Sequence, residues 1–203
     1  IVTGVQTCAL PILTKIAPVL RYPGAKWMLA DWIISHFPPH QSYLEPFAGS
    51  CAVFARKPRS KLETLNDLDG DVVNLFSVIR DQPEALARAV ALTPWARAEL
   101  EASYEPTTDS VERARRWLVR CWIGRGDVRG RAGWRHDVSA ARSSHMPVTW
   151  RGLPERIVAW ADRLLDAQIE SRPALEVIAR FDRPDTLLYV DPPYPLETRS
   201  GAL

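Results

Sequence analysis

The chain has 203 residues, of which 46% are hydrophobic and 25% charged, and its formal net charge is +2. This composition excludes a disordered chain, because enough apolar residues are present to bury a substantial core. No uncharged apolar run approaches the roughly 18 residues of a membrane-spanning helix. The three cysteines have neither the spacing of a disulfide framework nor that of a zinc knuckle. We therefore expect a cytoplasmic protein without a metal site.

The first twelve residues, IVTGVQTCALPI, need separate treatment. They lack an initiator Met and the basic beginning of a signal peptide. Their sequence resembles the translation of a common sequencing adapter. We expect residues 1–12 to be a non-native segment, and they are left out of the fold prediction.

The next part of the chain alternates between helices and strands. Apolar spacing predicts, in order, a helix at Gly24–Phe37, a strand at Ser42–Glu45, a helix at Cys51–Arg56, a strand at Lys61–Leu65 and a helix at Asp69–Arg80. Alternation of this kind favours a parallel sheet.

Residues 83–122 change character, with three helical segments punctuated by Pro83, Pro94 and Pro106. Residues 123–150 are loop-like and rich in glycine and arginine. Alternation then resumes with a helix at Pro154–Leu165, a strand at Gln168–Glu170, a helix at Ala174–Ala179 and a strand at Thr186–Val190. We predict a sheet domain formed by residues 13–82 and 153–203, interrupted by an inserted helical region at 83–152.

Positive charge is concentrated in one segment. Between Val111 and Arg151 there are ten arginines and only three acidic residues, while the rest of the chain has an excess of acidic residues. A basic segment on an otherwise acidic protein indicates a polyanionic partner. The alternative is compositional bias, which explains why arginine outnumbers lysine but not why the arginines cluster.

The predicted strand Ser42–Glu45 runs into a turn of mostly small residues, Pro46-Phe-Ala-Gly-Ser50, and the predicted helix begins at Cys51. Such a turn presents unpaired N–H groups to a ligand, and an acidic residue at the end of the next strand, here Asp67, can hold a ribose diol. The pattern indicates a nucleoside cofactor. With a single glycine it supports pyrophosphate binding poorly, and Glu45 suits an ammonium group better than a phosphate. A plain βαβ core unit is the alternative.

The motif Asp191-Pro192-Pro193-Tyr194 follows the predicted strand TLLYV and is more specific. Two prolines stiffen the backbone and remove two N–H groups. The Asp191 carboxylate and the Pro192 carbonyl can then accept hydrogen bonds from an exocyclic amine, while Tyr194 stacks on a flat base. Acceptance of both amine protons would localise the nitrogen lone pair. A proline-terminated strand end is the alternative.

Five segments together carry a family resemblance: RYPGAK at 21–26, YLEPFAGSCAVF at 43–54, NDLDGDVVNLF at 66–76, IES at 169–171 and YVDPPY at 189–194. In this order they resemble the DNA adenine methylase family (Dam-like, D12 class N6-adenine methyltransferases). The resemblance implies an α/β fold with a Rossmann-like S-adenosylmethionine-dependent methyltransferase sheet and an inserted helical target-recognition region. The chain ends nine residues after the motif, so we expect the C-terminal strands to be missing and the fragment to be inactive.

The resemblance also implies roles for individual residues. Those expected to bind S-adenosylmethionine are Tyr22, Lys26, Glu45, Phe47, Gly49, Asp67 and Leu68. The family usually places a further cofactor-binding aspartate where this chain has Pro173, and Glu170 is expected to replace it. Asp191, Pro192, Pro193 and Tyr194 are the expected catalytic residues. The expected DNA-binding residues are Arg125, Arg129, Arg131, Trp134 and Arg135, whereas Trp117, Trp122 and Cys51 are expected to pack in the core.

The implied function is methyl transfer to the exocyclic amine of a flipped adenine in double-stranded DNA. The expected location is the cytoplasm of a bacterium or of a phage-infected bacterium. The sequence does not define whether the protein belongs to a restriction-modification system. Two alternatives stay open. One is an RNA or other amino-methyltransferase, because some RNA methyltransferases share the DPPY motif. The other is a DNA- or cofactor-binding remnant without turnover. The sequence defines neither the recognition site nor the oligomeric state.

Overall fold

The computed structural model describes residues 16–126, 128, 130–139 and 146–193. The expected non-native segment 1–12 lies outside these residues, as do Arg129 and Tyr194. No helix within the described ranges is both long and apolar enough to cross a membrane.

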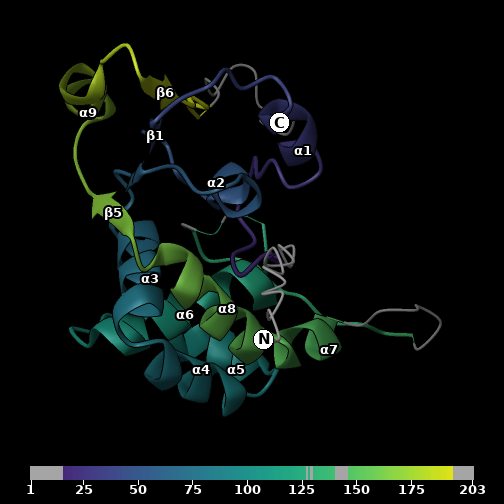
Figure 1. Cartoon of the computed structure of the whole chain (residues 1–203). Helices are drawn as coiled ribbons and strands as arrows, with labels where there is room; N and C mark the ends of the chain where they lie inside the picture. The colour runs from purple at the N-terminus through teal and green to yellow at the C-terminus, as the bar shows by residue number, and fades with distance from the viewer. Residues whose placement is uncertain (1–15, 127, 129, 140–145, 194–203) are drawn as a thin grey trace, which may run out of the picture.

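The parallel sheet expected from the alternating pattern is present (Figure 1). Its strands are β1 (Ser42–Glu45), β2 (Leu62–Asn66), β5 (Ala167–Glu170) and β6 (Thr186–Leu188), in the order β5-β2-β1-β6. All three pairings are parallel. The carboxyl ends of the four strands therefore meet at one edge, where Glu45, Asn66 and Glu170 are the last strand residues.

Short helices flank these strands. They are α1 (Ala30–Ile34), α2 (Ala52–Arg56), α3 (Gly70–Asp81) and α9 (Ala174–Phe181). Right-handed crossovers place the helices that follow β1 and β2 on one face of the sheet and α9 on the other, and α2 and α9 lie on opposite sides of the strands in Figure 1. Asp69 begins α3 by accepting a hydrogen bond from the Asp71 amide at 3.0 Å, a standard N-terminal cap.

A layer of helices fills the other half of the molecule, drawn in the lower part of Figure 1. It contains α4 (Pro83–Ala91), α5 (Arg97–Ala102), α6 (Ser110–Ile123), α7 (Met146–Arg151) and α8 (Leu153–Leu164). The three helices expected within 83–122 are thus present. A two-stranded antiparallel hairpin, β3 (Gly124–Arg125) and β4 (Gly133–Trp134), follows α6.

One hydrophobic core runs through both halves. Trp117 of α6 and Trp160 of α8 are almost completely buried, and the Trp160 ring lies 5.4 Å from that of Phe76 in α3. Trp122 is also buried, with its indole N–H donated to the Val19 carbonyl at 2.9 Å. Both Trp117 and Trp122 occupy the core, as expected. Because α4 and α6 pack against α3 and α8, the helical region shares its interior with the sheet-bearing part.

Three expected elements differ from the structure. The helix expected at Gly24–Phe37 is reduced to α1, because Gly24 adopts a left-handed turn (φ +79°). The last strand ends at Leu188 rather than Val190. The loop expected over residues 123–150 contains the hairpin and α7, whose elements of two to six residues are too short for hydrophobic periodicity to reveal.

Candidate functional site

A cavity of ≈ 1140 Å³ opens at the carboxyl ends of β1, β2 and β6. Its walls come from the turn after β1, the segment after β2, the N-terminal turn at Tyr22–Lys26, part of α6 and the segment after β6. In the sheet order, the chain runs outward from β1 through β2 to β5 and then returns to the far side of β1. Open α/β sheets bind ligands at the carboxyl edge near such a reversal.

Glu45 places a buried carboxylate in this cavity. It is 2% exposed, and its Oε1 accepts hydrogen bonds from the Tyr43 hydroxyl at 2.5 Å and from the Phe54 amide at 2.8 Å. Burial raises the pKa of Glu45 to about 7, although these hydrogen bonds and the nearby cations Lys57 and Arg163 act in the opposite direction. The carboxylate is therefore suited to a cationic ligand group, which would favour its charged form.

The glycine in the turn has a specific structural role. Gly49 has φ +48°, and a Cβ atom there would lie 3.3 Å from Cδ1 of Tyr22. Its amide donates to Oδ2 of Asp67 at 2.8 Å, while the Asp69 amide donates to Oδ1 at 2.9 Å. Asp67 thus joins the turn after β1 to the start of α3 and keeps its carboxylate at the cavity wall.

Cys51 begins α2 in the left-handed region, with φ +51°. Its amide donates to the Ala48 carbonyl at 2.7 Å, and the residue is completely buried. Burial raises the pKa of the thiol well above its usual value, which keeps it protonated. The structure therefore places Cys51 in the packed interior, as the sequence predicted.

The segment after β6 forms the opposite wall. Asp191, Pro192 and Pro193 line the cavity, and Oδ2 of Asp191 lies 2.6 Å from Nζ of Lys26. Lys26 also donates to the Gly24 carbonyl at 2.9 Å. The N-terminal turn and the motif after β6 are thus joined by an ion pair. Tyr194, the fourth residue of the motif, lies outside the described residues.

Almost all of the residues expected to bind the cofactor meet at this cavity: Tyr22, Lys26, Glu45, Phe47, Gly49, Asp67 and Leu68. Glu170 does not line it, and its carboxylate lies 3.5 Å from the Arg172 guanidinium instead. On this side the wall is formed by Arg172 and Ala174. The Arg172 backbone is held by the Asn66 side chain, which accepts from its amide at 2.9 Å and donates to its carbonyl at 3.0 Å.

Sequence reasoning missed the contribution of α6 to the cavity. Trp117 and Arg120 line it, with the Arg120 guanidinium 4.8 Å from the Trp117 ring centroid. Arg120 also pairs with Asp71, its Nη2 lying 3.2 Å from Oδ2. The sequence signal was present in the basic spacing of this helix, but nothing in it indicated which arginine turns toward the sheet.

The basic segment is only partly available to a partner. Several α6 arginines pair with acidic side chains: Arg113 and Arg120 with Asp71, Arg115 with Glu99 and Glu112, and Arg116 with Glu112. Two of these acidic partners, Asp71 and Glu99, come from outside the segment. The arginines of α6 are therefore largely neutralised within the protein, which leaves the arginines after α6 as the better candidates for contact with a polyanion.

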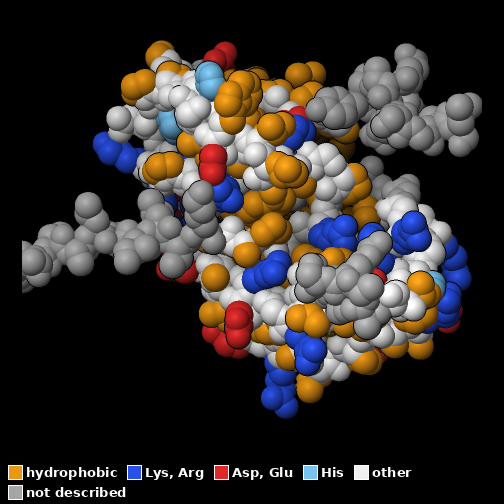
Figure 2. Space-filling view, turned by 90° about the vertical axis from the view of Figure 1, so that its right-hand side faces the viewer, with side chains coloured by type: hydrophobic (Ala, Val, Ile, Leu, Met, Phe, Trp, Pro, Cys, Tyr) orange, Lys and Arg blue, Asp and Glu red, His pale blue; other side chains and the backbone are white. Residues whose placement is uncertain are grey.

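The hairpin after α6 carries the remaining expected DNA contacts. Arg125 and Arg131 are exposed, whereas Trp134 and Arg135 are half-buried. Trp134 contacts the Arg97 guanidinium (4.8 Å) and stacks on His136 (4.9 Å). Burial, and then the charges of Arg21 and Arg125, lower the pKa of Arg135, so these three cations lie near one another. Lys and Arg side chains also gather on the lower half of the face in Figure 2.

Comparison with known families agrees with this site. The family model of the D12 class N6 adenine-specific DNA methyltransferases matches residues 22–116, which include the N-terminal turn, Glu45, Gly49 and Asp67. The matched region stops before the hairpin and before Asp191. Among proteins with a curated description, none matches the chain. Residues 22–116, a little under half of the chain, therefore match the family of D12 class N6 adenine-specific DNA methyltransferases.

Proposed function

We propose that this chain is an S-adenosylmethionine-dependent DNA methyltransferase that modifies the N6 amine of a flipped adenine. One observation carries the proposal. Residues expected on the cofactor side, among them Glu45 and Asp67, line the same cavity as Asp191 and Pro192. At ≈ 1140 Å³, its volume slightly exceeds the usual range for a single small ligand, about 300–1,000 Å³, so it has room for a cofactor and a base.

The residues present fit S-adenosylmethionine. The buried carboxylate of Glu45 suits the ammonium group of the methionine part, and the Asp67 carboxylate suits the ribose hydroxyls. Gly49 has no side chain, so the ring of Tyr22 can pack closely against the turn, and both residues line the cavity. Phe47 and Leu68 offer apolar surface for the adenine ring. The bound cofactor would supply an electrophilic methyl group.

On the target side, Asp191 and the Pro192 carbonyl would accept hydrogen bonds from the exocyclic amine. Acceptance of both protons directs the nitrogen lone pair away from the ring. Pro192 and Pro193 restrict the backbone that carries these acceptors, so the base meets a preformed site. Lys26 pairs with Asp191, so a base at this site would share the Asp191 carboxylate with Lys26 or displace it. Tyr194 would complete the site by stacking.

The hairpin and its neighbours would contact the DNA backbone. Arg125, Arg131 and Arg135 supply positive charge next to the helical layer, and phosphate contacts give most of the affinity of DNA-binding proteins. Arg129, which lies outside the described residues, stays a proposed DNA contact from the sequence alone. Trp134 is the aromatic side chain proposed to contact DNA. We infer that residues 83–152 act as the target-recognition region, residues 13–82 and 153–203 hold the catalytic site, and the protein acts in the bacterial cytoplasm.

The test uses the full chain with S-adenosylmethionine and three substrates: adenine-rich duplex DNA, the same strand alone, and an RNA of the same sequence. Digestion and mass spectrometry then measure N6-methyladenine. Modification of duplex DNA supports the proposal, and preferential modification of RNA supports the alternative amino-methyltransferase. Cofactor and DNA binding without product, under conditions that activate a known adenine methyltransferase, would assign the chain as a non-catalytic binder.

A further inference from the structure

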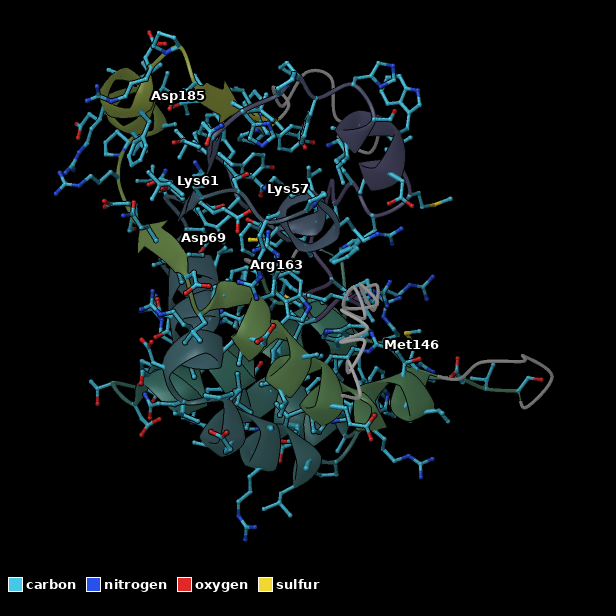
Figure 3. The ribbon with its side chains drawn as sticks, in the orientation of Figure 1. Lys57, Lys61, Asp69, Met146, Arg163 and Asp185 are labelled. Carbon is cyan, nitrogen blue, oxygen red and sulfur yellow. The ribbon has the colours of Figure 1, made fainter. Side chains whose placement is uncertain are left out.

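A cluster of buried charges lies behind the cavity, on the side of Glu45 away from the solvent. Lys57 follows α2, Glu63 lies in β2 and Arg163 comes from α8, and each is at most 5% exposed. Figure 3 shows Lys57 beside α2 and Arg163 at the edge of the helical layer that faces α2. The Arg163 guanidinium lies 2.5 and 2.9 Å from the two Glu63 oxygens, and Nζ of Lys57 lies 2.5 Å from Oε1.

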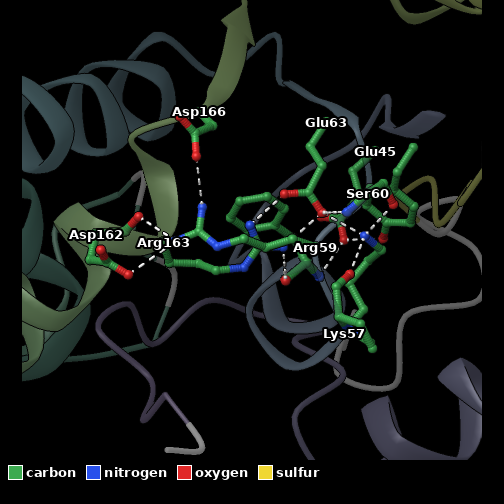
Figure 4. Close-up of polar contacts among 11 residues, drawn as sticks. Glu45, Lys57, Arg59, Ser60, Glu63, Asp162, Arg163 and Asp166 are labelled. Carbon is green, nitrogen blue, oxygen red and sulfur yellow. Dashed lines mark hydrogen bonds and ion pairs between the residues drawn. The ribbon is translucent and has the colours of Figure 1, made fainter. Parts of the chain in front are cut away.

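Two hydrogen bonds connect this cluster with Glu45. Nη2 of Arg163 donates to the Phe54 carbonyl at 2.8 Å, and the Phe54 amide donates to Oε1 of Glu45 at 2.8 Å. The Arg163 guanidinium also lies 3.6 Å from the Phe54 ring centroid. Phe54 is thus held by Arg163 on one side and holds Glu45 on the other. Figure 4 shows Glu45, Glu63 and Arg163 in one view.

Tyr43 supports the same carboxylate from the strand. Its hydroxyl donates to Oε1 of Glu45 at 2.5 Å, and Nζ of Lys57 lies 4.3 Å from its ring centroid. Neither Tyr43 nor Arg163 lines the cavity. Both therefore reach a ligand only through Glu45.

The charges in this region balance only when Glu45 is included. Lys57 and Arg163 bring two positive charges, whereas Glu63 alone brings one negative charge. Desolvation raises the pKa of Glu45, and the hydrogen bonds from Tyr43 and Phe54 and the charges of Lys57 and Arg163 favour its ionised form. The Cys51 thiol also interacts with Glu45, but burial keeps that thiol neutral.

We propose that Arg163 and Tyr43 are positioning residues that hold the Glu45 carboxylate in place at the cofactor side of the cavity and favour its charged form. This inference rests on the proposed function in one respect only, the cofactor ammonium group as the partner of Glu45. Stability alone explains the cluster poorly, because apolar residues commonly replace buried ion pairs without loss of stability. The chain of contacts also reaches from α8, in the helical layer, to the cavity.

The first experiment follows Glu45 without any ligand. The full chain is labelled with ¹³C at the glutamate carboxyls, the Glu45 signal is assigned with Glu45→Gln, and its titration midpoint is measured. We expect Arg163→Met and Tyr43→Phe to raise the midpoint, by about one pH unit for the arginine, because each change removes support for the charged form. Arg163→Lys should recover part of the shift.

The matched control is Arg59→Met. Arg59 forms ion pairs with Asp162 and Asp166 next to the cluster, but it is 41% exposed and has no contact with Phe54 or Glu45. It should leave the midpoint unchanged. If Arg163→Met does not fold, Tyr43→Phe, which removes only a hydroxyl, decides the test. An unchanged midpoint in the folded variants overturns the proposal, whatever the cofactor measurements give.

The second experiment measures the affinity for S-adenosylmethionine by calorimetry at pH 6.5 and 8.5. We expect Arg163→Met to weaken binding about tenfold at pH 6.5 and clearly less at pH 8.5, where Glu45 ionises without its help. If Arg163 has a purely structural role, Arg163→Met should lower the thermal stability, while the folded variant should bind the cofactor as tightly as the wild type at both pH values. That result would contradict the proposal. If the wild-type chain does not bind the cofactor, the proposed function fails, while the titration still decides the link between Arg163 and Glu45.

Discussion

The ammonium group of Lys26 lies 2.6 Å from the carboxylate of Asp191, although the two residues are far apart in the sequence. Their ion pair brings the turn before α1 to the end of β6, across the mouth of the cavity. Both side chains are partly exposed, 19% for Lys26 and 24% for Asp191, so a ligand can compete for either of them. The pair thus keeps a carboxylate at the cavity wall and provides it with a counter-ion.

Asp191→Asn should reduce methyl transfer by about 10²- to 10³-fold, a loss typical of removing one group that stabilises the transition state. The amide keeps the shape of the side chain but has only one acceptor oxygen. DNA affinity should change less than twofold, because most of it comes from phosphate contacts. Single-turnover rates and a DNA-binding titration give the two values.

A suitable control for that experiment is Asp185→Asn. Asp185 is exposed and precedes β6, at the end of the strand opposite Asp191 (Figure 3). Equal losses of rate and DNA affinity in Asp191→Asn would remove Asp191 from the reacting site.

Replacing Arg125 and Arg131 together by Gln should weaken DNA binding and flatten its dependence on salt. The slope of log K against log salt should fall by about 0.9 for each DNA phosphate that the variant no longer neutralises. Arg88 and Arg183, exposed arginines of α4 and of the segment after α9, provide the matched double variant. An identical slope in the hairpin variant and the wild type would place the DNA surface elsewhere.

Gly49→Ala should weaken cofactor binding and destabilise the protein by about 1–2 kcal/mol, the usual cost of left-handed backbone for a residue with a side chain. The new methyl group would also lie 3.3 Å from Tyr22. Urea unfolding and calorimetry measure the two effects. Gly130→Ala is the control, because no atom lies within 4 Å of its Cβ position and its φ is not in the left-handed range. If Gly49→Ala binds S-adenosylmethionine as tightly as the wild type, the cofactor does not depend on the conformation of this turn.

The stability of the wild-type protein should fall as pH rises from about 4.5 to about 7. The folded protein binds the Glu45 proton more tightly than the unfolded chain, since burial raises its pKa from 4.5 to about 7. Between these two pH values the unfolded chain has released the Glu45 proton and the folded protein still holds it, so the free energy of unfolding decreases as pH rises. Above about pH 7 both states have released the proton, and the free energy of unfolding no longer changes because of Glu45. Glu45→Gln should remove this dependence, as measured by the melting temperature between pH 4.5 and 8. A slope that persists in Glu45→Gln would assign the effect to another group.

Local sequence patterns were sufficient for most of the sheet. The boundaries of β1, β2 and β5 were predicted within one residue, although their sequences, SYLE, LETLN and AQIE, mix apolar and polar residues. At α1 the same patterns gave the buried face but not the length of the helix. Ala30 is buried, and Ile33, Ile34 and Phe37 are partly buried against the core, as their spacing predicts, but the helix is limited to Ala30–Ile34.

Residues whose own segment carries the chemistry, such as Glu45, Asp67 and Asp191, were selected from the sequence and line the cavity. Residues placed there by tertiary packing were missed. Trp117 was correctly placed in the core, but its position at the cavity wall depends on how α6 packs against the sheet. The buried cluster of Lys57, Glu63 and Arg163 was missed for the same reason, since Arg163 and Glu63 are separated by 100 residues in the sequence.

The shared interior of the two halves limits how this protein can be re-engineered. A chimera between related proteins is easiest to make when the exchanged region has its own hydrophobic core. Here the inner faces of α4 and α6 form part of the same core as α3 and α8. If residues 83–152 were replaced by those of a relative, the new core-facing side chains of α4 and α6 would not match the side chains of α3 and α8 against which they pack. A change of specificity should instead start from the hairpin, whose exposed side chains can be varied without repacking the core.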